Sequence, residues 1–372
     1  MKIITIIGAR PQFVKAAMVS RAIISHNRNN NHLVEEFILH TGQHYDETMN
    51  DIFFKKLDIP LPAWQLNCGQ GSHAEMTAGM WIDIEKVLKQ NRPDYVLVYG
   101  DTNSTLAGAL AAAKLHIPVV HVEAGLRSFN KQMPEEINRS LTDHLSDYLF
   151  CPTYAAVRNL NHEGITTNVI HSGDVMYDAA LTFGEIAGQT STILTSLQVE
   201  AKQFYLCTVH RAENTDRLKR LSHIIQALIE IARPDCPVIL PLHPRTKKQL
   251  HTWQLFPKIE TNKAIRLVEP VDYLDMIMLE KHAKAILTDS GGVQKEAYFH
   301  RTPCITLRDE TEWVETITAG WNQIAGCRKE KILYCLANNT QRTDIEEYGD
   351  GHAAEIIVNT LLHEVKKLKT NN

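Results

Sequence analysis

Short apolar segments alternate with longer segments of helical periodicity along the whole chain. The apolar segments are rich in β-branched and aromatic residues and are bounded by glycine, proline or polar positions. They lie at 2–7, 36–40, 95–100, 118–122, 148–151, 204–209, 237–242, 264–268, 285–288 and 303–307. This alternation predicts an α/β protein in which parallel strands are joined by crossover helices.

The alternation falls into two runs, separated near Gly173. We predict two Rossmann-like, doubly wound domains, 1–172 and 173–351, that face each other across a cleft. The final segment, 352–372, carries apolar residues at helical spacing and should be an amphipathic helix packed on one of the domains. A length of 372 residues suffices for two hydrophobic cores. Length alone is equally compatible with one large α/β barrel. The polar stretch 25–32 is expected to be a surface loop.

Composition narrows the class of protein. The formal net charge of -4 gives no electrostatic reason to expect nucleic acid or an anionic membrane as a partner. The seven cysteines are scattered without a Cys-x-x-Cys pair, so we expect no disulfide framework, no zinc ribbon and a reducing, cytoplasmic setting. The apolar run 3–7 is too short for a signal peptide, and no stretch of about 20 apolar residues follows.

Ligands of open α/β sheets bind at the carboxyl ends of the strands, so the residues that follow strands are the informative ones. After the first strand, Arg10 and Lys15 flank the start of a helix and form either an anion site or a pair of solvated charges. Gly-x-Gly-x-x-Gly follows none of the predicted strands, which disfavours a nicotinamide cofactor.

Carboxylates follow two neighbouring strands of the first half. Asp101 and Glu123 each end a strand, and Glu135 and Glu136 come directly after Pro134. Turn and helix-capping roles explain each of them singly. Three of them, Asp101, Glu123 and Glu135, converging on one sheet edge would supply candidate acids and bases for proton transfer.

Basic residues follow two strands of the second half. His210 and Arg211 come after 204–209, and His243 comes after 237–242. They suit phosphate, although a core histidine beside an Arg–Glu pair explains the first two equally well. The 18 histidines include no His-Glu-x-x-His or similar ligand cluster, so no metal is expected.

The segment "LTDSGGVQKEA" at 287–297 is a strand-to-helix turn. Ser290, Gly291 and Gly292 leave backbone N–H groups open at a helix start that suits a diphosphate, and Glu296 could accept hydrogen bonds from ribose hydroxyls. A glycine-eased helix start with nothing bound is the alternative, but Arg10, His210 and Arg211 favour the diphosphate.

These segments together resemble the UDP-N-acetylglucosamine 2-epimerase family of the non-hydrolysing bacterial type. The matching stretches are "GARPQFVK", "HTGQHYD", "GDTNSTLAG", "HVEAGLR", "MPEEINR", "TVHRAEN", "LTDSGGVQKEA" and "LRDETEW", in order from about residue 3 to 320. The resemblance implies a GT-B-like fold and a cytoplasmic homodimer that acts on a UDP-sugar with no cofactor, neither NAD nor metal.

The implied reaction interconverts UDP-GlcNAc and UDP-ManNAc for surface polysaccharide synthesis. UDP is eliminated to leave a 2-acetamidoglucal and is then added back. The resemblance assigns catalysis to Asp101, Glu123, Glu135 and His210, phosphate binding to Arg10, His210, Ser290, Gly291 and Gly292, the ribose to Glu296, and a place near the reaction centre to Lys15.

The chain departs from the family pattern at two places. Trp313 stands where many members have an arginine, which resembles a branch that includes epimerases of UDP-2,3-diacetamido-2,3-dideoxyglucuronic acid for O-antigen; that sugar is the alternative substrate. An activator site for a second UDP-sugar is matched at Gln43 and His243, but Asp46 replaces its second glutamine.

Other classes remain to be separated by experiment. A GT-B glycosyltransferase would share the two domains and the diphosphate site, but it needs an acceptor surface and at most one base. A hydrolysing 2-epimerase would release free ManNAc. A UDP-sugar sensor would exchange no C2 hydrogen with solvent.

Overall fold

The computed structural model describes residues 1–30, 33–43, 59–69, 71–338 and 340–370, without the side chains of residue 10 and residues 365–370. The chain forms two compact units. The first unit comprises Met1–Ala179 together with Glu346–Asn372, and the second comprises Ala180–Ile345. We describe each unit by itself.

The first unit is built on a seven-stranded parallel sheet in the order β3-β2-β1-β4-β5-β6-β7. Its strands are β1 (Lys2–Ile7), β2 (Glu35–His40), β3 (Trp64–Gln65), β4 (Tyr95–Tyr99), β5 (Val119–Val122), β6 (Tyr148–Cys151) and β7 (Val169–His171). The central strands are buried on both faces, which explains their nearly continuous apolar sequences.

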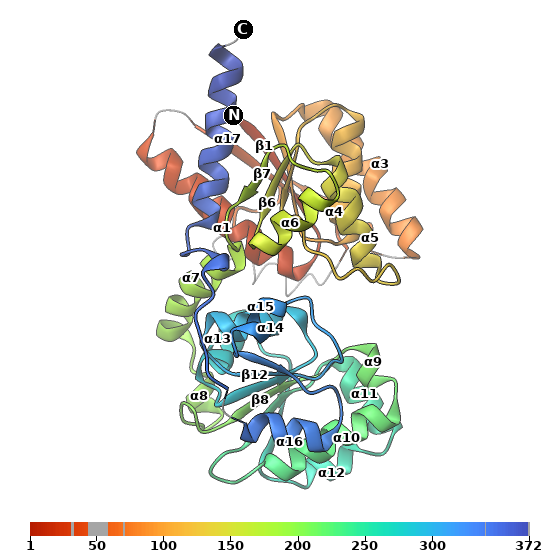
Figure 1. Ribbon diagram of the computed structural model, residues 1–372. Coiled ribbons are helices and arrows are strands. Elements are labelled where there is room, and N and C mark those ends of the chain that lie inside the picture. The colour runs from red at the N-terminus through yellow and green to blue at the C-terminus, as the bar shows by residue number, and fades with distance from the viewer. Residues whose placement is uncertain (31–32, 44–58, 70, 339, 371–372) are drawn as a thin grey trace. The chain divides into compact units, whose positions relative to one another are not determined.

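Helices cover both faces of this sheet (Figure 1). They are α1 (Arg10–Asn29), α3 (His73–Asn91), α4 (Asn103–Lys114), α5 (Pro134–Leu145), α6 (Tyr154–His162), the first residues of α7 (Val175–Thr190), the short 3-10 helix η1 (Glu346–Tyr348) and α17 (Ala353–Thr370). Apolar residues of α3 and α4 form one core with β1, β4 and β5. On the other face α17 packs along α1.

The C-terminal helix α17 buries the apolar stripe that the sequence predicts. Ala354, Ile357, Val358 and Leu361 are buried, whereas Leu362 is half-buried. The side chain of Val365 lies outside the described residues.

The second unit is built on a six-stranded parallel sheet in the order β10-β9-β8-β11-β12-β13. Its strands are β8 (Tyr205–Thr208), β9 (Val238–Pro241), β10 (Ile265–Val268), β11 (Ala285–Thr288), β12 (Cys304–Thr306) and β13 (Asn322–Ile324).

The second sheet also has a core on each face. Its helices are α8 (Ile193–Ser196), α9 (Ala212–Thr215), α10 (Leu218–Ile231), α11 (Pro244–Thr252), α12 (Phe256–Glu260), α13 (Tyr273–His282), α14 (Gly291–Phe299), α15 (Val314–Thr318) and α16 (Lys329–Ala337). Residues of α10, α11, α12 and α16 pack on one face, and residues of α13 and α14 pack on the other (Figure 1).

The predicted α/β fold class is confirmed, and two open sheets replace the alternative of a single barrel. All ten predicted strands are present within a few residues of their predicted ends. The predicted loop at 25–32 is wrong in its first half, because α1 continues to Asn29 and ends on the basic residues His26 and Arg28, which complement the helix dipole. Among the described residues, no helix is long and apolar enough to span a membrane.

Each sheet has a point at which the strand order reverses. In the first sheet it lies between β1 and β4, and in the second it lies between β8 and β11. Crevices at the carboxyl edge open at such points, because the connections leave toward opposite faces. The loops after these four strands therefore position the candidate site residues.

Candidate functional site

Lys15 and Glu123 form an ion pair at the carboxyl edge of the first sheet. The Lys15 Nζ lies 2.7 Å from a Glu123 carboxylate oxygen, and the two side chains are only 9% and 13% exposed. Gly100, at φ +64°, directly follows β4 beside them, and a Cβ there would lie 3.3 Å from the Lys15 Nζ. The positive φ favours glycine at this position, and a larger side chain would crowd the Lys15 Nζ.

Glu123 itself has a backbone conformation that is rare outside glycine. Its φ is +74°, and its N–H and that of Ala124 both donate to the Phe150 carbonyl of β6, at 3.1 and 3.0 Å. The neighbouring strand therefore holds the backbone of Glu123 in the left-handed region. Strain of this kind concentrates at functional sites, where it aims a side chain.

Asp101 lies one residue beyond Gly100 and belongs to the same group of charges. Burial raises the pKa of Asp101, the ion pair with Arg139 opposes that rise, and the charge of Glu123 adds to it; the net pKa lies above the ordinary value. A carboxyl group with a raised pKa suits proton transfer near neutral pH.

Arg139, on α5, joins Asp101 to Glu136. Its guanidinium donates to Asp101 and, at 2.6 Å, to a carboxylate oxygen of Glu136. Asn138 donates to the Asp101 carbonyl at 3.0 Å. Helix α5 therefore fixes both the side chain and the backbone of Asp101.

Glu136 and Glu135 have different surroundings. Glu136 is buried and accepts the backbone N–H groups of Ser128 and Phe129, each at 2.9 Å, which closes the loop before α5. Glu135, which the resemblance assigns to catalysis, is exposed in the first turn of α5. The ion-pair network around Asp101 thus uses Glu136.

A network of buried polar side chains holds the loops at this edge of the sheet in place. His121, on β5, contacts the Gly100 carbonyl through Nε2 and Asp143 through Nδ1, both at 2.7 Å. Asp143 also accepts from Arg127 at 2.6 Å and from the Gly125 N–H at 3.1 Å. The loops after β4 and β5 are therefore fixed to each other and to α5.

In the second unit, Asp289 organises the loop after β8. Its side chain has no solvent exposure and accepts the backbone N–H groups of His210 and Arg211 and the Nδ2 group of Asn214, at 3.0 to 3.1 Å. The His210 Nδ1 lies 3.2 Å from Asp289 Oδ1. Burial alone would raise the pKa of Asp289, but the interactions with His210 and Asn214 outweigh it and hold the pKa below its ordinary value.

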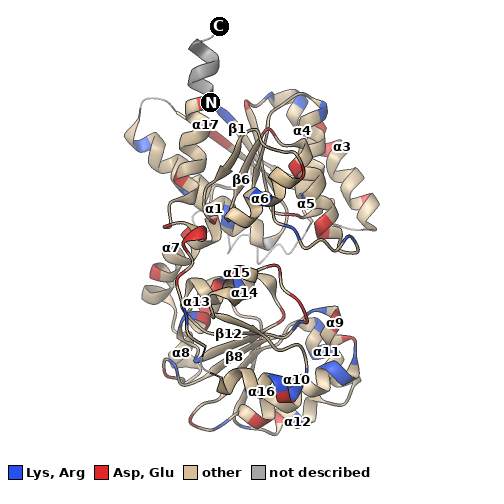
Figure 2. Cartoon of the chain, in the orientation of Figure 1, with Lys and Arg blue, Asp and Glu red and all other residues tan. Residues whose placement is uncertain are grey.

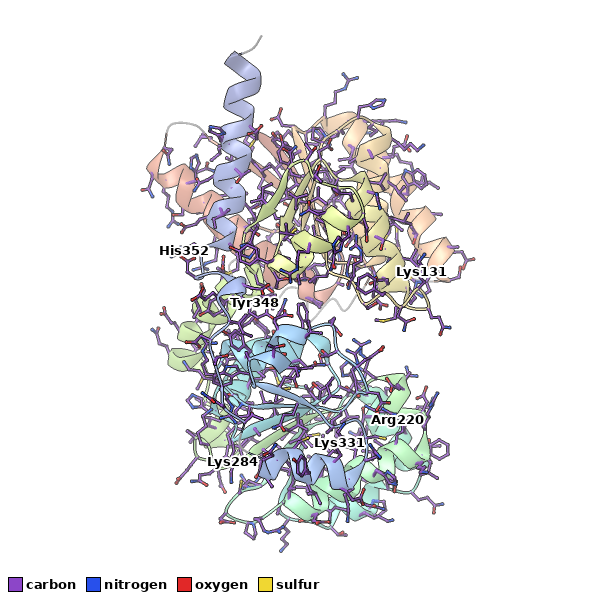
Figure 3. All side chains as sticks on the ribbon, viewed as in Figure 1. Lys131, Arg220, Lys284, Lys331, Tyr348 and His352 are labelled. Atoms are coloured by element: carbon purple, nitrogen blue, oxygen red, sulfur yellow. The ribbon has the colours of Figure 1, made fainter. Side chains whose placement is uncertain are left out.

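Side chains from neighbouring elements lie beside the loop after β8. Arg220 of α10, labelled in Figure 3, donates to Asn214 Oδ1 at 2.9 Å. His243, exposed after β9, has its ring centroid 5.6 Å from that of His210. Arg245 lies in α11, where Figure 2 shows a concentration of basic residues. Of these basic residues, Arg220 is paired with Glu213 and Asp309, and Arg245 is paired with Asp216.

Helix α14 begins at the carboxyl edge of β11. Ser290 caps it, since its hydroxyl accepts the Val293 N–H at 3.5 Å. Gly291 is buried and Gly292 is exposed, and Glu296, half-buried, follows about one turn later. The first N–H groups of a helix lack acceptors within the helix, so this start can bind an anion.

The remaining residues that the sequence analysis named are Arg10, Gln43 and Asp46. Arg10 is the first residue of α1, but its side chain lies outside the described residues, as does Asp46. Gln43 accepts hydrogen bonds from the Ser104 N–H and hydroxyl, at 3.0 and 2.6 Å. It thereby connects the loop after β2 to the start of α4.

The sequence analysis gave no site role to several residues of these networks, among them Asp289, Arg139, His121 and Asp143. The only available signal was position, because Asp289 ends a buried strand and Arg139 lies one turn after Glu136. In the described part of the chain, no group of three or more His, Cys, Asp or Glu side chains could hold a metal ion.

Comparison with known proteins identifies the family. The model of the family described as UDP-N-acetylglucosamine 2-epimerase matches residues 26–362. A protein of Methanococcus maripaludis named as a UDP-N-acetylglucosamine 2-epimerase homolog is 52% identical over 97% of this chain and 99% of its own length. The UDP-2,3-diacetamido-2,3-dideoxy-D-glucuronate 2-epimerase of Pseudomonas aeruginosa is 50% identical over 97% of this chain and 99% of its own length.

Solved structures agree with these sequence relatives. The UDP-GlcNAc 2-epimerase of Methanocaldococcus jannaschii, in complex with UDP-GlcNAc and UDP, matches with a TM-score of 0.86 and 46% identity over 98% of this chain and 100% of that one. The Neisseria meningitidis enzyme bound to UDP-GlcNAc matches with a TM-score of 0.85 and 32% identity over the same shares. This chain therefore belongs to the UDP-N-acetylglucosamine 2-epimerase family of isomerases.

Proposed function

We propose that this protein is a non-hydrolysing UDP-sugar 2-epimerase that interconverts UDP-GlcNAc and UDP-ManNAc. The observation that carries the proposal is the group of Asp101, Glu123 and Lys15 at one sheet edge, where a half-buried carboxyl with a raised pKa interacts with a second carboxylate. The first unit thus supplies acid–base groups, and the second supplies an anion site at the start of α14.

The proposed reaction begins with elimination. A carboxylate takes the C2 proton of the sugar, the electrons of that C–H bond form the C1–C2 double bond, and the C1–O bond breaks with its electrons leaving on UDP. The product pair is a 2-acetamidoglucal and UDP. Protonation of C2 on the opposite face and return of the UDP oxygen to C1 complete the inversion, so no atom is gained or lost. Asp101, Glu123 and Glu135 are the carboxyl groups proposed to supply the acid and the base.

His210 has the proposed role of stabilising the leaving diphosphate. Because its Nδ1 faces the Asp289 carboxylate at 3.2 Å, the Nδ1 position carries a proton and Nε2 is the atom that can serve the ligand. Arg211, Ser290, Gly291 and Gly292 are proposed to bind the diphosphate, and Arg10 is proposed to assist them. Glu296 is proposed to accept hydrogen bonds from the ribose.

The alternative substrate has specific support. The Pseudomonas aeruginosa relative, 50% identical, is named for UDP-2,3-diacetamido-2,3-dideoxy-D-glucuronate, and the Methanocaldococcus jannaschii relative, 46% identical, is named for UDP-N-acetylglucosamine. Both sugars present the same C2 centre, so the same acid–base groups would serve either one. In both cases the product would feed surface polysaccharide synthesis, with O-antigen the destination for the uronic acid.

Proton NMR of the reaction products tests the proposal. Purified protein is incubated separately with UDP-GlcNAc and with the diacetamido uronic acid nucleotide, in the presence of a chelator and without NAD. We expect UDP-ManNAc from the first. Conversion of the second alone would assign the alternative substrate. Release of free ManNAc would indicate a hydrolysing enzyme, and conversion of neither would contradict the proposal.

We propose that the active protein is a homodimer in the cytoplasm. All seven cysteines are free thiols, which suits a reducing compartment. Ile137 and Leu141, one turn apart on α5, are 47% and 48% exposed, and such an apolar pair suits a subunit interface. Light scattering should give twice the chain mass of 42.1 kDa, and a mass of one chain would contradict the dimer.

A further inference from the structure

The indole of Trp313 presents a buried hydrogen-bond donor. The side chain, just before α15, is only 5% exposed, and among the described residues no group accepts a hydrogen bond from its Nε1–H. Buried tryptophan N–H groups usually have an acceptor, because a donor that loses water without replacement is costly. An acceptor from a ligand would satisfy this one.

The Trp313 Nε1 lies beside the start of α14. A Cβ built on Gly291, the first residue of α14, would lie 3.7 Å from Nε1 and only 2.2 Å from Glu312 Oε1. A side chain at this position would therefore displace the Glu312 carboxylate, and the Trp313 loop lies in close contact with the helix start. The indole N–H thus lies close to the first turn of α14, whose leading N–H groups have no acceptor within the helix.

The position of the ring is fixed by its neighbours. The Trp313 backbone N–H donates to the Thr311 hydroxyl at 3.2 Å, and that hydroxyl donates to Gln294 Oε1 at 2.6 Å. Lys295, buried in α14, places its Nζ 4.3 Å from the ring centroid. A cation over an indole withdraws electron density from it, which strengthens Nε1–H as a donor, and its charge also favours an anion nearby.

We propose that Trp313 is a further ligand-binding residue, whose indole N–H donates a hydrogen bond to a diphosphate oxygen of the UDP moiety at the start of α14. The inference rests on the proposed UDP-sugar function and extends its diphosphate site. Hydrogen bonds to charged oxygens are stronger than those to neutral acceptors, so this contact should contribute measurably to affinity.

Calorimetric titration of two probes, UDP and uridine, tests the proposal. Trp313→Phe keeps an aromatic ring over Lys295 but removes the N–H. It should bind UDP about tenfold more weakly than the wild type, with uridine affinity unchanged within about twofold. Trp321→Phe is the matched control, because the Trp321 indole already donates to the Thr343 carbonyl at 2.8 Å; it should leave both affinities unchanged. Unchanged UDP affinity in Trp313→Phe, or equal losses for UDP and uridine, would overturn the inference.

NMR of the indole N–H groups in the wild-type protein tests the same contact without relying on the affinity of Trp313→Phe. The five tryptophans give five indole N–H resonances after ¹⁵N labelling, and single Trp→Phe variants assign them. UDP should move the Trp313 resonance downfield and slow its exchange with water, whereas uridine should not. If UDP binds and this resonance stays in place, the inference is wrong and the proposed function stands. If the wild type binds no UDP, the proposed function fails as well.

Discussion

His210 Nδ1 lies 3.2 Å from an oxygen of Asp289, a carboxylate that also accepts the backbone N–H of the same histidine at 3.0 Å. Asp289 thus fixes both the ring and the loop that carries it. Since the pKa of Asp289 lies below its ordinary value, the carboxylate remains ionised and can stabilise a positive charge on the imidazole.

Asp289→Asn should lower kcat/KM at least about tenfold, because an amide cannot stabilise the imidazolium and can select the wrong tautomer. The effect should act through the histidine. In a His210→Ala background the same substitution should therefore cost little more, which steady-state kinetics on the double variant can measure.

Asp216→Asn is the matched control for that experiment. Asp216 is an exposed carboxylate that pairs with Arg245 in the same unit. Its loss should leave kcat/KM nearly unchanged. Additive losses from Asp289→Asn and His210→Ala would show that Asp289 does not act through the histidine.

Glu123→Gln should lower kcat about 10²-fold or more while UDP affinity stays unchanged, because the carboxylate acts on C2 and not on the nucleotide. His210→Ala should also lose most turnover, but with weaker UDP binding. Turnover assays and UDP titration separate the two roles, and circular dichroism checks folding. Glu269→Gln, at an exposed partner of Lys247, is the control. Wild-type turnover in Glu123→Gln or in His210→Ala would refute the role assigned to that residue.

Arg139→Gln should shift the acidic limb of the pH profile of kcat/KM upward by about one unit or more. Burial raises the pKa of Asp101 and Arg139 opposes that rise, so removing the guanidinium raises the pKa further. Asp101 must then lose its proton at a higher pH before it can act as a base. Arg139→Lys keeps the charge and should restore most of the profile. An unmoved limb in Arg139→Gln would mean that Asp101 does not control it.

Asp178 should make stability depend on pH. Its buried carboxylate accepts the Ala353 and Ala354 N–H groups at the start of α17, at 3.2 and 2.8 Å. Burial raises its pKa from 3.8 to about 6, so between these values the folded state binds the proton more tightly than the unfolded state does. The free energy of unfolding therefore falls as pH rises through this range.

Urea unfolding of Asp178→Asn checks this effect. Between pH 4.5 and 7.5 the variant should gain about 2 kcal/mol of unfolding free energy relative to the wild type, because it lacks the titrating group. Asp235→Asn, at an exposed position, should show no such trend. Parallel pH profiles for Asp178→Asn and the wild type would contradict the prediction.

The sequence sufficed to predict those features that short-range patterns determine. Apolar β-rich runs such as 2–7 and 285–288 are strands because buried parallel strands need no polar alternation. The carboxyl ends of β4 and β5 lie side by side, so Asp101 and Glu123 could be expected to approach each other. Neither β3 nor β13 was foreseen, since two or three residues are too few for a periodic signal.

The sequence did not allow us to predict which side chains pair with each other across the fold. Arg139 pairs with Asp101, 38 residues away, because α5 packs on α4, which follows Asp101, and no local pattern encodes that packing. The resemblance assigns catalysis to Glu135, which is exposed, and no pattern in the sequence indicated that its neighbour Glu136 is the buried partner of Arg139. Asp289 holds the His210 loop in place, yet the two residues are 79 positions apart in the sequence. These contacts depend on strand order, which tertiary packing determines.

Proton NMR of the protein with UDP-GlcNAc in D2O tests the proposed elimination and re-addition most directly. Elimination and re-addition require removal of the C2 proton and its replacement from solvent. We expect UDP-ManNAc with deuterium at C2, together with loss of the C2 proton signal from the remaining UDP-GlcNAc. UDP-ManNAc that keeps its original C2 hydrogen would contradict the mechanism, and no change in a protein shown to be folded and to bind UDP would contradict the assignment of UDP-GlcNAc as substrate.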